Sequence, residues 1–434
     1  MKLVLAEKPS VAQSISKVLG ANKRGSGYLE GNGYIVSWCI GHLVELAKPE
    51  SYDERYAKWR KEDLPILPDN WKYEISAGTN KQFLVLKQLM ERPDVESLVC
   101  ATDAGREGEL IFRLVYHQCK CRKPFERLWI SSMEDEAIRQ GFASLKPGKE
   151  YDALYKAALC RERADWIVGI NATRLFSCLY GTTLNVGRVM TPTLGMVVVR
   201  EAAIFAFVPE PFYTVQLTLD RFTAVSERFH DKKTADEIRN KCGKAGSCMV
   251  SKVEKQEKAE KPPLLYDLTT LQREANRPYG FTAQQTLDYA QSLYEKKLVT
   301  YPRTDSRFLT DDMADSLPGL IGAASEKFGA SIAEKMDIAR VINGKKVTDH
   351  HALIPTMSVT AAELSELSAG ERAVLTMISA RLLAAVGKPY RFAETAVEVQ
   401  CADTVFTAKG KAVLDEGWKE VERQFFHKEE KEEK

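Results

Sequence analysis

A tyrosine stands beside an arginine in the segment Leu298–Ser306, which reads LVTYPRTDS. Pro302 cannot continue a helix and pushes Tyr301 towards extended backbone, so Tyr301 and Arg303 point the same way. A phenol next to a guanidinium is suited to nucleophilic attack on a phosphate. The alternative is a half-buried tyrosine after a helix, with Arg303 in solvent. The short motif alone does not decide between them.

A helix is expected to carry this segment. Thr282 is a suitable N-cap, and the apolar residues that follow recur at helical spacing. They are Leu287, Ala290, Leu293, Tyr294 and Leu298.

Carboxylates crowd a second stretch, ATDAGREGE, at residues 101–109. Such groups repel one another unless a cation neutralises them, and hard oxygen ligands at a tight turn suit Mg²⁺. The alternative is a helix N-terminus that favours acids through its dipole. Glu107 and Glu109 fit that alternative, whereas Asp103 fits it less well because it directly follows a buried strand.

The first 145 residues alternate strand-like and helix-like pieces, which predicts a mainly parallel sheet with helices on both faces. The predicted strands are Lys2–Ala6, Tyr34–Ile40, Ser97–Ala101 and Glu126–Ile130. The helices are predicted from Ser10, over Asn80–Met90 and Arg106–His117, and from about Met133. Ligands of such sheets bind at the carboxyl ends of the strands, where Glu7 and Asp103 are expected.

Composition sets the class and the compartment. The chain has 434 residues with 44% hydrophobic content, which predicts several folded domains. It has no apolar run of 18 residues and no signal-peptide pattern at its N-terminus, so a cytoplasmic protein with no membrane segment is expected. Nine cysteines are scattered without a paired CxxC, which indicates reduced thiols rather than disulfides or a zinc site.

Several segments together resemble one family. Glu7–Ser10 and Asp103–Glu109 look like a Toprim domain, and Tyr301–Ser306 resembles the active-site tyrosine segment of type IA DNA topoisomerases of the topoisomerase III branch. Three further segments resemble that family's DNA-groove and histidine segments in the family's order. They are Arg161–Arg174, Val186–Leu194 and Asp349–Thr356.

The resemblance implies a reaction. Tyr301 would attack a backbone phosphate of single-stranded DNA to give a 5′-phosphotyrosine bond, without ATP, since no GxxxxGK[ST] loop is present. Arg303 would stabilise the charge on the phosphate, Lys8 would contact the scissile phosphate and Glu7 would pass a proton to or from the 3′-oxygen.

The resemblance also implies Mg²⁺ held by Asp103 and Glu107, with Glu7 nearby. The chain departs from the family's Asp-x-Asp-x-Glu pattern, because Gly105 replaces the middle acid. We therefore expect weaker Mg²⁺ binding, with Glu109 or water completing the shell and resealing affected most.

A basic stretch follows, although the net charge of +2 leaves nucleic acid open. Given the resemblance, the arginines of this stretch are expected to contact DNA phosphates rather than to form a solvated helix face. The expected contacts are Arg161, Arg163, Arg174, Arg188 and Thr191. The family usually has glutamine where this chain has Met190, so that contact is expected to be missing.

His350 and His351 are adjacent, so only one of them can point into a given site. The resemblance favours His350 near the DNA phosphate, against packing as the alternative role. His42 also lies in a family-like segment, but no chemical role follows from its position.

The predicted fold is mixed and multidomain, with a Rossmann-like Toprim sheet, a helical DNA-binding segment, a discontinuous β-rich hinge domain and a helical active-site tyrosine domain. The resemblance implies that these domains form the toroidal type IA topoisomerase architecture, whole or incomplete. The predicted boundaries are 1–148, 149–211, 212–262, 263–357, 358–422 and a charged, disordered tail at 423–434. The sequence also predicts a linker at Glu254–Lys261 with Pro262-Pro263, and a hairpin continuation at Phe406–Ala408 and Trp418–Val421.

The family's C-terminal continuation and zinc-ribbon tail are not found, so the chain is expected to be either a fragment or a naturally short protein. The first functional hypothesis is a monomeric bacterial topoisomerase that decatenates DNA and relaxes negative supercoils, associated with the nucleoid or a mobile element, with a helicase as a possible partner. The competing hypothesis is a non-catalytic single-stranded DNA-binding module. A Toprim nuclease or primase would leave the Tyr301 segment unexplained.

Overall fold

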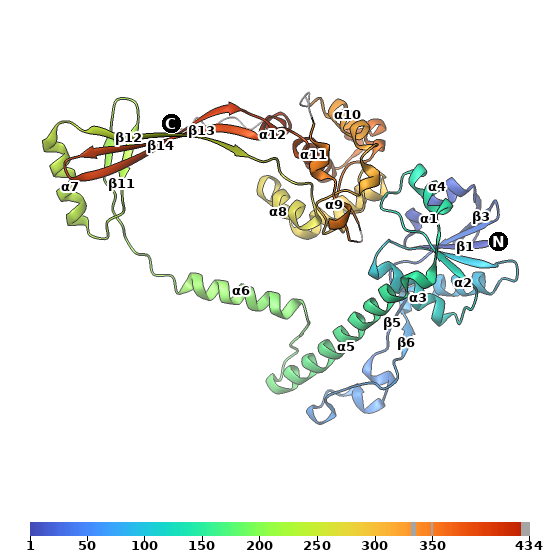
Figure 1. Ribbon diagram of the computed structural model, residues 1–434. Helices are drawn as coiled ribbons and strands as arrows, with labels where there is room; N and C mark the ends of the chain where they lie inside the picture. The colour runs from blue at the N-terminus through green and yellow to red at the C-terminus, as the bar shows by residue number, and fades with distance from the viewer. Residues whose placement is uncertain (331–335, 349, 427–434) are drawn as a thin grey trace. The chain divides into compact units, whose positions relative to one another are not determined.

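The structure is a computed structural model that describes residues 1–330, 336–348 and 350–426. It divides into two compact units (Figure 1). The first unit comprises Met1–Glu201, Tyr266–Arg307 and Lys345–Leu375, and the second comprises Ala202–Leu265, Phe308–Gly344 and Thr376–Lys434.

A seven-stranded sheet forms the centre of the first unit, in the order β2-β3-β4-β1-β7-β8-β9. Its inner strands β4, β1, β7 and β8 run parallel, as the alternating sequence predicts. The edge strands β2, β3 and β9 are antiparallel. The strands are β1 Lys2–Ala6, β2 Lys23–Arg24, β3 Tyr28–Gly31, β4 Tyr34–Trp38, β7 Ser97–Ala101, β8 Phe125–Arg127 and β9 Lys146–Pro147.

Helices cover both faces of this sheet (Figure 1). On one face, Leu3 and Leu5 of β1 pack in a core with residues of α2 Asn80–Glu91 and α3 Arg106–Gln118. On the other lie α1 Pro9–Leu19 and α4 Asp135–Ala143, which contact each other. Pro9 opens α1 where its missing N–H costs nothing, and Gly20 ends it in a left-handed conformation.

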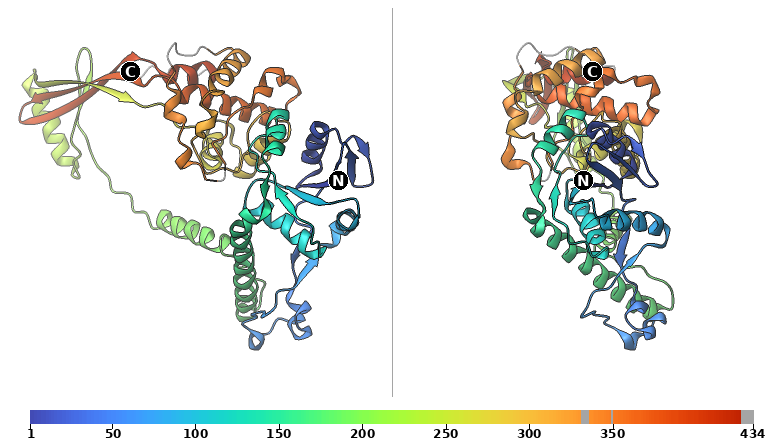
Figure 2. Two further views of the ribbon diagram at one scale, coloured as in Figure 1. Left: turned by 45° about the vertical axis from the view of Figure 1, so that its right-hand side comes forward. Right: turned by 90° about the vertical axis from the view of Figure 1, so that its right-hand side faces the viewer.

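A long helix continues from the sheet. α5 Asp152–Tyr180 contacts α3 and has few buried residues of its own (Figure 2). A two-stranded sheet of β5 Val44–Leu46 and β6 Tyr73–Ile75 lies in the same unit. α6 Met190–Phe205 follows α5, and none of its residues is buried.

The tyrosine segment also belongs to the first unit. It follows α8 Leu268–Tyr279 and α9 Ala283–Glu295. Thr282 caps α9 as predicted, since its hydroxyl accepts from the Gln285 N–H at 3.1 Å while the Gln285 side chain accepts from the Thr282 N–H at 3.0 Å. After α9, Thr300 donates its N–H to the Ile354 carbonyl at 2.9 Å, which joins the tyrosine and histidine segments.

The second unit contains an antiparallel sheet in the order β10-β11-β14-β13-β12. Its strands are β10 Gln216–Thr218, β11 Thr223–Ser226, β12 Met249–Glu260, β13 Tyr390–Cys401 and β14 Thr404–Asp415. Its helices are α7 Lys232–Ala245, α10 Leu317–Phe328, α12 Trp418–Phe426 and the end of α11 Ala369–Ala385. Strands from before and after the tyrosine segment thus share one sheet, as predicted for the discontinuous β-rich region.

Two sequence predictions in this unit are wrong. The charged run predicted as a linker is part of β12, whose backbone pairs with β13 from Met249 to Glu260. Every residue of β12 is exposed, and its charged second half shows no apolar alternation. The backbone ladder with β13 holds this half, together with ion pairs such as that of Lys258 with Glu394.

The second error concerns Trp418–Val421. It is the start of α12 and not a hairpin strand, because Trp418 and Val421 lie three residues apart and both are buried on one helical face. The predicted tail begins inside α12, and its residues 427–434 lie outside the described residues. Among the described helices, none is both long and apolar enough to cross a membrane.

Candidate active site

Glu7 and Asp103 meet at the carboxyl edge of the parallel sheet. They follow β1 and β7, which pair in register from Lys2 opposite Ser97 to Ala6 opposite Ala101. The Asp103 N–H donates to Glu7 Oε2 at 3.1 Å. The two acids that the sequence places at strand ends are therefore neighbours in space.

The turn that carries Asp103 is fixed from beneath. The Thr102 hydroxyl donates to the Gly108 carbonyl at 2.7 Å, and a Cβ at position 108 would lie 2.1 Å from the Asp103 carbonyl oxygen. Only glycine fits that approach. The fully buried Arg127 donates to the carbonyls of Thr102 at 2.7 Å and Asp103 at 2.6 Å.

Glu109 helps to hold the buried arginines beneath the turn and does not face the open edge of the sheet. It is fully buried, and its carboxylate pairs with Arg127 at 3.1 Å and with Arg113 at 2.8 Å. A carboxylate held by two buried guanidinium groups has no free lone pair directed at solvent. The sequence-based suggestion that Glu109 completes a metal shell therefore does not fit this arrangement.

The two edge carboxylates disfavour each other's ionisation. Burial, together with the negative charge of Asp103, raises the pKa of Glu7 to about 7. Burial likewise raises the pKa of Asp103, although the nearby Lys8 ammonium lowers it in part. Both carboxyls are therefore harder to ionise than they would be in water.

Tyr301 projects into this edge. Its backbone N–H donates to the Ser131 carbonyl at 3.1 Å, and its ring packs edge-on against Tyr294 at 5.4 Å between centroids. Tyr301 lies close to Asp103 and Glu7, and burial together with the charges of these two carboxylates raises the pKa of Tyr301. The phenol is therefore protonated and needs a proton acceptor before it can attack.

Two cations stand near these groups. The Lys8 ammonium pairs with the Glu295 carboxylate at 2.7 Å, and Ser10 also donates to Glu295 at 3.4 Å. Arg303 is exposed, and its charge acts to lower the pKa values of Glu7 and Tyr301. Arg303 is therefore placed to meet a phosphate that enters the edge, whereas Lys8 is held by Glu295.

His350 lies against Tyr301, and His351 does not. The two rings of His350 and Tyr301 have centroids 4.3 Å apart, whereas His351 Nδ1 bonds to the Ala352 carbonyl at 2.8 Å. His350 Nε2 bonds to the Ala104 carbonyl and its Nδ1 to the Ser131 hydroxyl. Burial lowers the pKa of His350 to about 4, so the imidazole is neutral. Asp349 of the same motif lies outside the described residues.

Comparison with known proteins identifies the family. A family model described as DNA topoisomerase matches residues 149–434, and one described as Toprim domain matches residues 2–133. The chain belongs to the DNA topoisomerase family. The resemblance of the tyrosine and carboxylate motifs to type IA topoisomerases is thereby confirmed.

Named relatives agree with this assignment. Proteins named DNA topoisomerase 3 from Bacillus subtilis (strain 168) and Bacillus licheniformis are 44% and 43% identical over 434 and 435 residues. Each match covers 96% of this chain and 59% of the relative, so the chain spans about three fifths of the length of these relatives. The structure of full-length topoisomerase I from Thermotoga maritima has the same fold, with a TM-score of 0.72, 24% identity, and coverage of 97% of this chain and 67% of that one.

The carboxylate edge offers part of a metal shell. No group of three or more metal-ligating side chains is close enough to hold an ion among the described residues. Glu7 and Asp103 are adjacent, and the pKa values of both are raised. A bound cation would offset the repulsion between their negative charges. Glu107 is instead paired with Arg161 and lies 3.8 Å from His42. Two carboxylates fit Mg²⁺, which keeps several of its waters, whereas Glu107 must exchange partners to join them.

The predicted DNA-contacting residues have protein partners. Arg188 pairs with Asp165, with its Nη2 3.2 Å from Asp165 Oδ2, and the guanidinium of Arg163 lies 5.2 Å from the Trp71 ring. Thr191 accepts from the Gly187 N–H at 3.1 Å at the start of α6.

Arg174 differs from these arginines. It is buried, donates to the Tyr56 carbonyl at 2.7 Å and lies over the Trp59 ring at 5.4 Å. These contacts hold residues 56–59 against α5. Helical spacing places Arg174 with the other arginines of a basic helix face. It carries no information about the distant loop of residues 56–59, which covers Arg174 in the structure.

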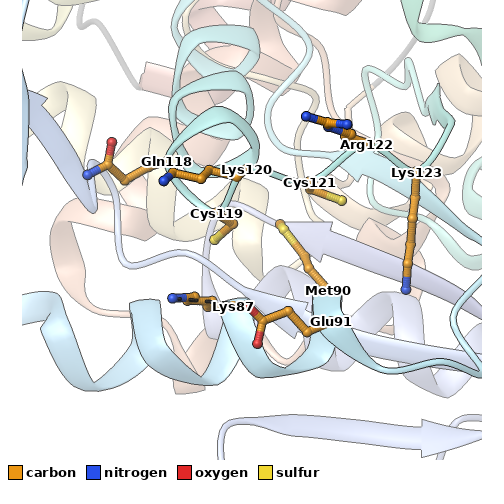
Figure 3. Close-up of a pocket in the computed structure, with 9 residues that line it drawn as sticks. All are labelled: Lys87, Met90, Glu91, Gln118, Cys119, Lys120, Cys121, Arg122 and Lys123. Carbon is orange, nitrogen blue, oxygen red and sulfur yellow. Dashed lines mark ion pairs between the residues drawn. The ribbon is translucent and has the colours of Figure 1, made fainter.

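A pocket elsewhere in the first unit is separate from these groups (Figure 3). It has a volume of about 570 Å³ and lies where α2 and α3 end, whereas Asp103 lies where α3 begins. Its lining is Lys87, Met90, Glu91, Gln118, Cys119, Lys120, Cys121, Arg122 and Lys123.

Four residues of the site were missed by sequence reasoning. They are Arg127, Trp129, Ser131 and Glu295. Each acts through a partner more than 100 positions away or through backbone carbonyls, so local spacing carries no signal. The alternation of Arg127 and Trp129 along the predicted strand Glu126–Ile130, continued by Ser131 just after it, was the available clue.

Proposed function

We propose that this chain is a type IA topoisomerase of the topoisomerase III kind, which breaks and rejoins one DNA strand without ATP. The observation that carries the proposal is that Tyr301 lies beside Asp103 and Glu7, whose charges act on its phenol, while the Asp103 N–H donates to the Glu7 carboxylate at 3.1 Å. A nucleophile, a proton acceptor and a proton donor are thus gathered at one sheet edge.

Cleavage begins at a phosphate placed over this edge. The Tyr301 oxygen attacks phosphorus as its proton passes to Asp103, and the bond between phosphorus and the 3′-oxygen breaks. Glu7, with a pKa of about 7, delivers its proton to the departing oxygen. The products are a 5′-phosphotyrosine bond and a 3′-hydroxyl, so one phosphoester replaces another and no energy source is needed.

Cations balance the charge that builds on the phosphate. Arg303 is exposed and unhindered, whereas Lys8 must leave Glu295 to reach the phosphate. Resealing runs the same steps in reverse, with Glu7 accepting the proton of the 3′-hydroxyl. Mg²⁺ held by Glu7 and Asp103, with Glu107 once it leaves Arg161, would neutralise the carboxylates and align the 3′-end.

DNA would lie along the basic segment. Arg161, Arg163 and Arg188 would exchange their internal partners for phosphates, which positions the strand without reading its sequence. Arg174 would support the segment from within. The domain division at 148, 211, 262, 357 and 422, with the β-rich domain as the hinge of the tyrosine domain, is part of this proposal.

The proposed substrates are single-stranded, negatively supercoiled and catenated DNA, with decatenation favoured over relaxation. A bacterial cytoplasmic monomer that works with a helicase is the proposed setting. These substrates and this setting are proposed because the chain is similar to relatives named DNA topoisomerase 3. The chain spans 59% of the length of such a relative.

Trapping the covalent intermediate tests the reaction. The protein is incubated with a 3′-end-labelled single-stranded oligonucleotide and Mg²⁺, denatured, and resolved on a denaturing gel. We expect a labelled protein band that Tyr301→Phe reduces by roughly 10⁴-fold or more. Tyr289→Phe, which removes a hydroxyl from α9 away from the carboxylates, is the control and should keep the band.

Absence of the band while the oligonucleotide remains bound would overturn the proposal. The competing function, a non-catalytic single-stranded DNA-binding module, would then hold.

A further inference from the structure

One extended segment contacts both halves of the candidate active site. Arg127 ends β8, and the chain continues through Trp129 to Ser131. Alternate residues of extended chain share a face. Leu128 and Ile130 face the other way, where each would contact a Cβ added to Gly141 of α4 at 2.6 Å.

Arg127, Trp129 and Ser131 face the candidate active site, and each contacts a different part of it. Arg127 binds the Thr102 and Asp103 carbonyls. The Trp129 ring stacks on His350, with 6.3 Å between centroids and an interplanar angle of 11°. Ser131 accepts the Tyr301 N–H through its carbonyl at 3.1 Å, and its hydroxyl lies 3.2 Å from His350 Nδ1.

These contacts fix the state of the His350 ring. The Ala104 carbonyl only accepts, so the neutral ring carries its hydrogen on Nε2. The Nδ1 lone pair then accepts from the Ser131 hydroxyl. With both nitrogens engaged, His350 ties the tyrosine segment to the Asp103 turn.

We infer that Ser131 and Trp129 are positioning residues for the reaction, because they hold the His350 ring, and the ring holds Tyr301 over the Asp103 turn. Ser131 binds both the backbone of the nucleophile and the imidazole beside it, so its hydroxyl controls their spacing. Trp129 lies behind the imidazole, between it and Tyr151, whose ring stacks on Trp129 at 5.1 Å.

This inference rests on the proposed function and assigns a task to residues that touch neither substrate nor metal. It also changes the expectation for His350. The sequence favours a phosphate contact, whereas here His350 acts within the protein and reaches a phosphate only if it leaves Ala104.

Ser131→Ala tests the inference, with Ser131→Thr as the conservative variant. Alanine keeps the carbonyl that binds Tyr301 and removes only the hydroxyl. A misplaced ring loses near-attack geometry, so we expect the rate of adduct formation at saturating oligonucleotide to fall roughly tenfold, with no change in oligonucleotide affinity. Threonine restores a hydroxyl and should recover most of the rate.

A nitrogen NMR spectrum of the protein labelled with ¹⁵N-histidine provides a readout independent of turnover. The His350 signals are assigned by their loss in His350→Gln. We expect the Nδ1 resonance to move in Ser131→Ala and to return in Ser131→Thr. Trp129→Phe keeps a stacked ring and should be mild, whereas Trp129→Leu should lower the rate as Ser131→Ala does.

The outcomes separate the two proposals. No adduct with the unsubstituted protein means that the proposed function fails, whatever Ser131 does. An active protein whose rate and Nδ1 resonance are both unchanged in Ser131→Ala overturns the positioning role and leaves the topoisomerase function standing. A uniform loss of oligonucleotide affinity with an unmoved Nδ1 resonance also overturns it.

Discussion

Two glutamates of the first unit experience opposite environments. Glu7 lies at the sheet edge beside Asp103, and its pKa is raised to about 7. Glu371, near the start of α11, is 6% exposed, and its pKa is lowered to about 2. Burial raises the pKa of both carboxyls, so the partners decide the difference.

The partners are plainly unlike. Glu371 accepts from the Ser292 hydroxyl and the Lys296 ammonium at 2.6 Å each, and from the Ser368 N–H at 2.9 Å. Glu7 accepts one backbone N–H and faces another carboxylate. A satisfied carboxylate stabilises the fold, whereas a crowded one stores unfavourable energy that a cation or a proton can relieve. The crowded site is the one suited to chemistry.

The sharpest test of this contrast is Glu7→Gln. We expect the rates of cleavage and resealing to fall by about 10²- to 10⁴-fold, because the proton donor is lost. The folded pKa lies above the usual 4.5, so Glu7 favours folding at low pH and that contribution is lost as pH rises through about 7. In EDTA at pH 8 the variant should therefore be at least as stable as the unsubstituted protein.

Rapid-quench kinetics and urea denaturation measure the two quantities. Glu96→Gln is a matched control, since the Glu96 side chain is 87% exposed. A clear drop in stability with activity retained would make Glu7 a structural residue and remove the contrast.

Glu371→Gln should show the reverse. The folded pKa lies below the usual 4.5, so the stabilisation is complete above pH 4.5 and is lost as pH falls from 4.5 towards 2. We expect the free energy of unfolding to decrease by about 2–3 kcal/mol at pH 7, with the difference shrinking below pH 4. Circular dichroism during denaturation at pH 7 and pH 3 measures this.

Glu366→Gln serves as the control, because Glu366 is exposed in the turn before α11. Equal stability of Glu371→Gln and the unsubstituted protein at pH 7 would contradict the assignment.

The smallest effect is expected for Gly105→Asp, which adds a third carboxylate to the crowded edge. The backbone at Gly105 is extended, with φ 173°, and no atom lies within 4 Å of an added Cβ, so the side chain fits. We expect the Mg²⁺ concentration for half-maximal resealing to fall about tenfold, since another hard oxygen ligand strengthens the site.

Gly105→Ala separates charge from backbone effects and should leave the Mg²⁺ requirement unchanged. The same requirement in Gly105→Asp as in the unsubstituted protein would count against metal binding at this turn.

Much of the first unit follows from local patterns. Apolar runs bounded by turns predict β1 and β7 at their observed bounds, and Thr282 is predicted as the cap that α9 has. Because parallel strands end at one edge, Glu7 and Asp103 were expected together before any coordinate was known. These features depend on residues close in sequence or on a general property of parallel sheets.

Other features depend on contacts between residues far apart in the sequence. The part of β12 from Glu254 onward has a linker's composition, yet it pairs with β13 as a strand. Arg174 matches a basic helix face, yet a loop more than 100 residues earlier covers it. Glu109 resembles a metal ligand, but Arg127 and Arg113 enclose it.

The sequence by itself determined the chemical groups of this protein: a tyrosine, an arginine and paired carboxylates in recognisable motifs, on elements whose periodicity is local. Only the tertiary structure decided which of these groups have hydrogen-bond and ion-pair partners and which lie beside groups of like charge. Ionisation depends on burial and on partners within a few ångströms, and those partners come from distant positions: Glu295 for Lys8, Ser131 for His350 and Arg161 for Glu107.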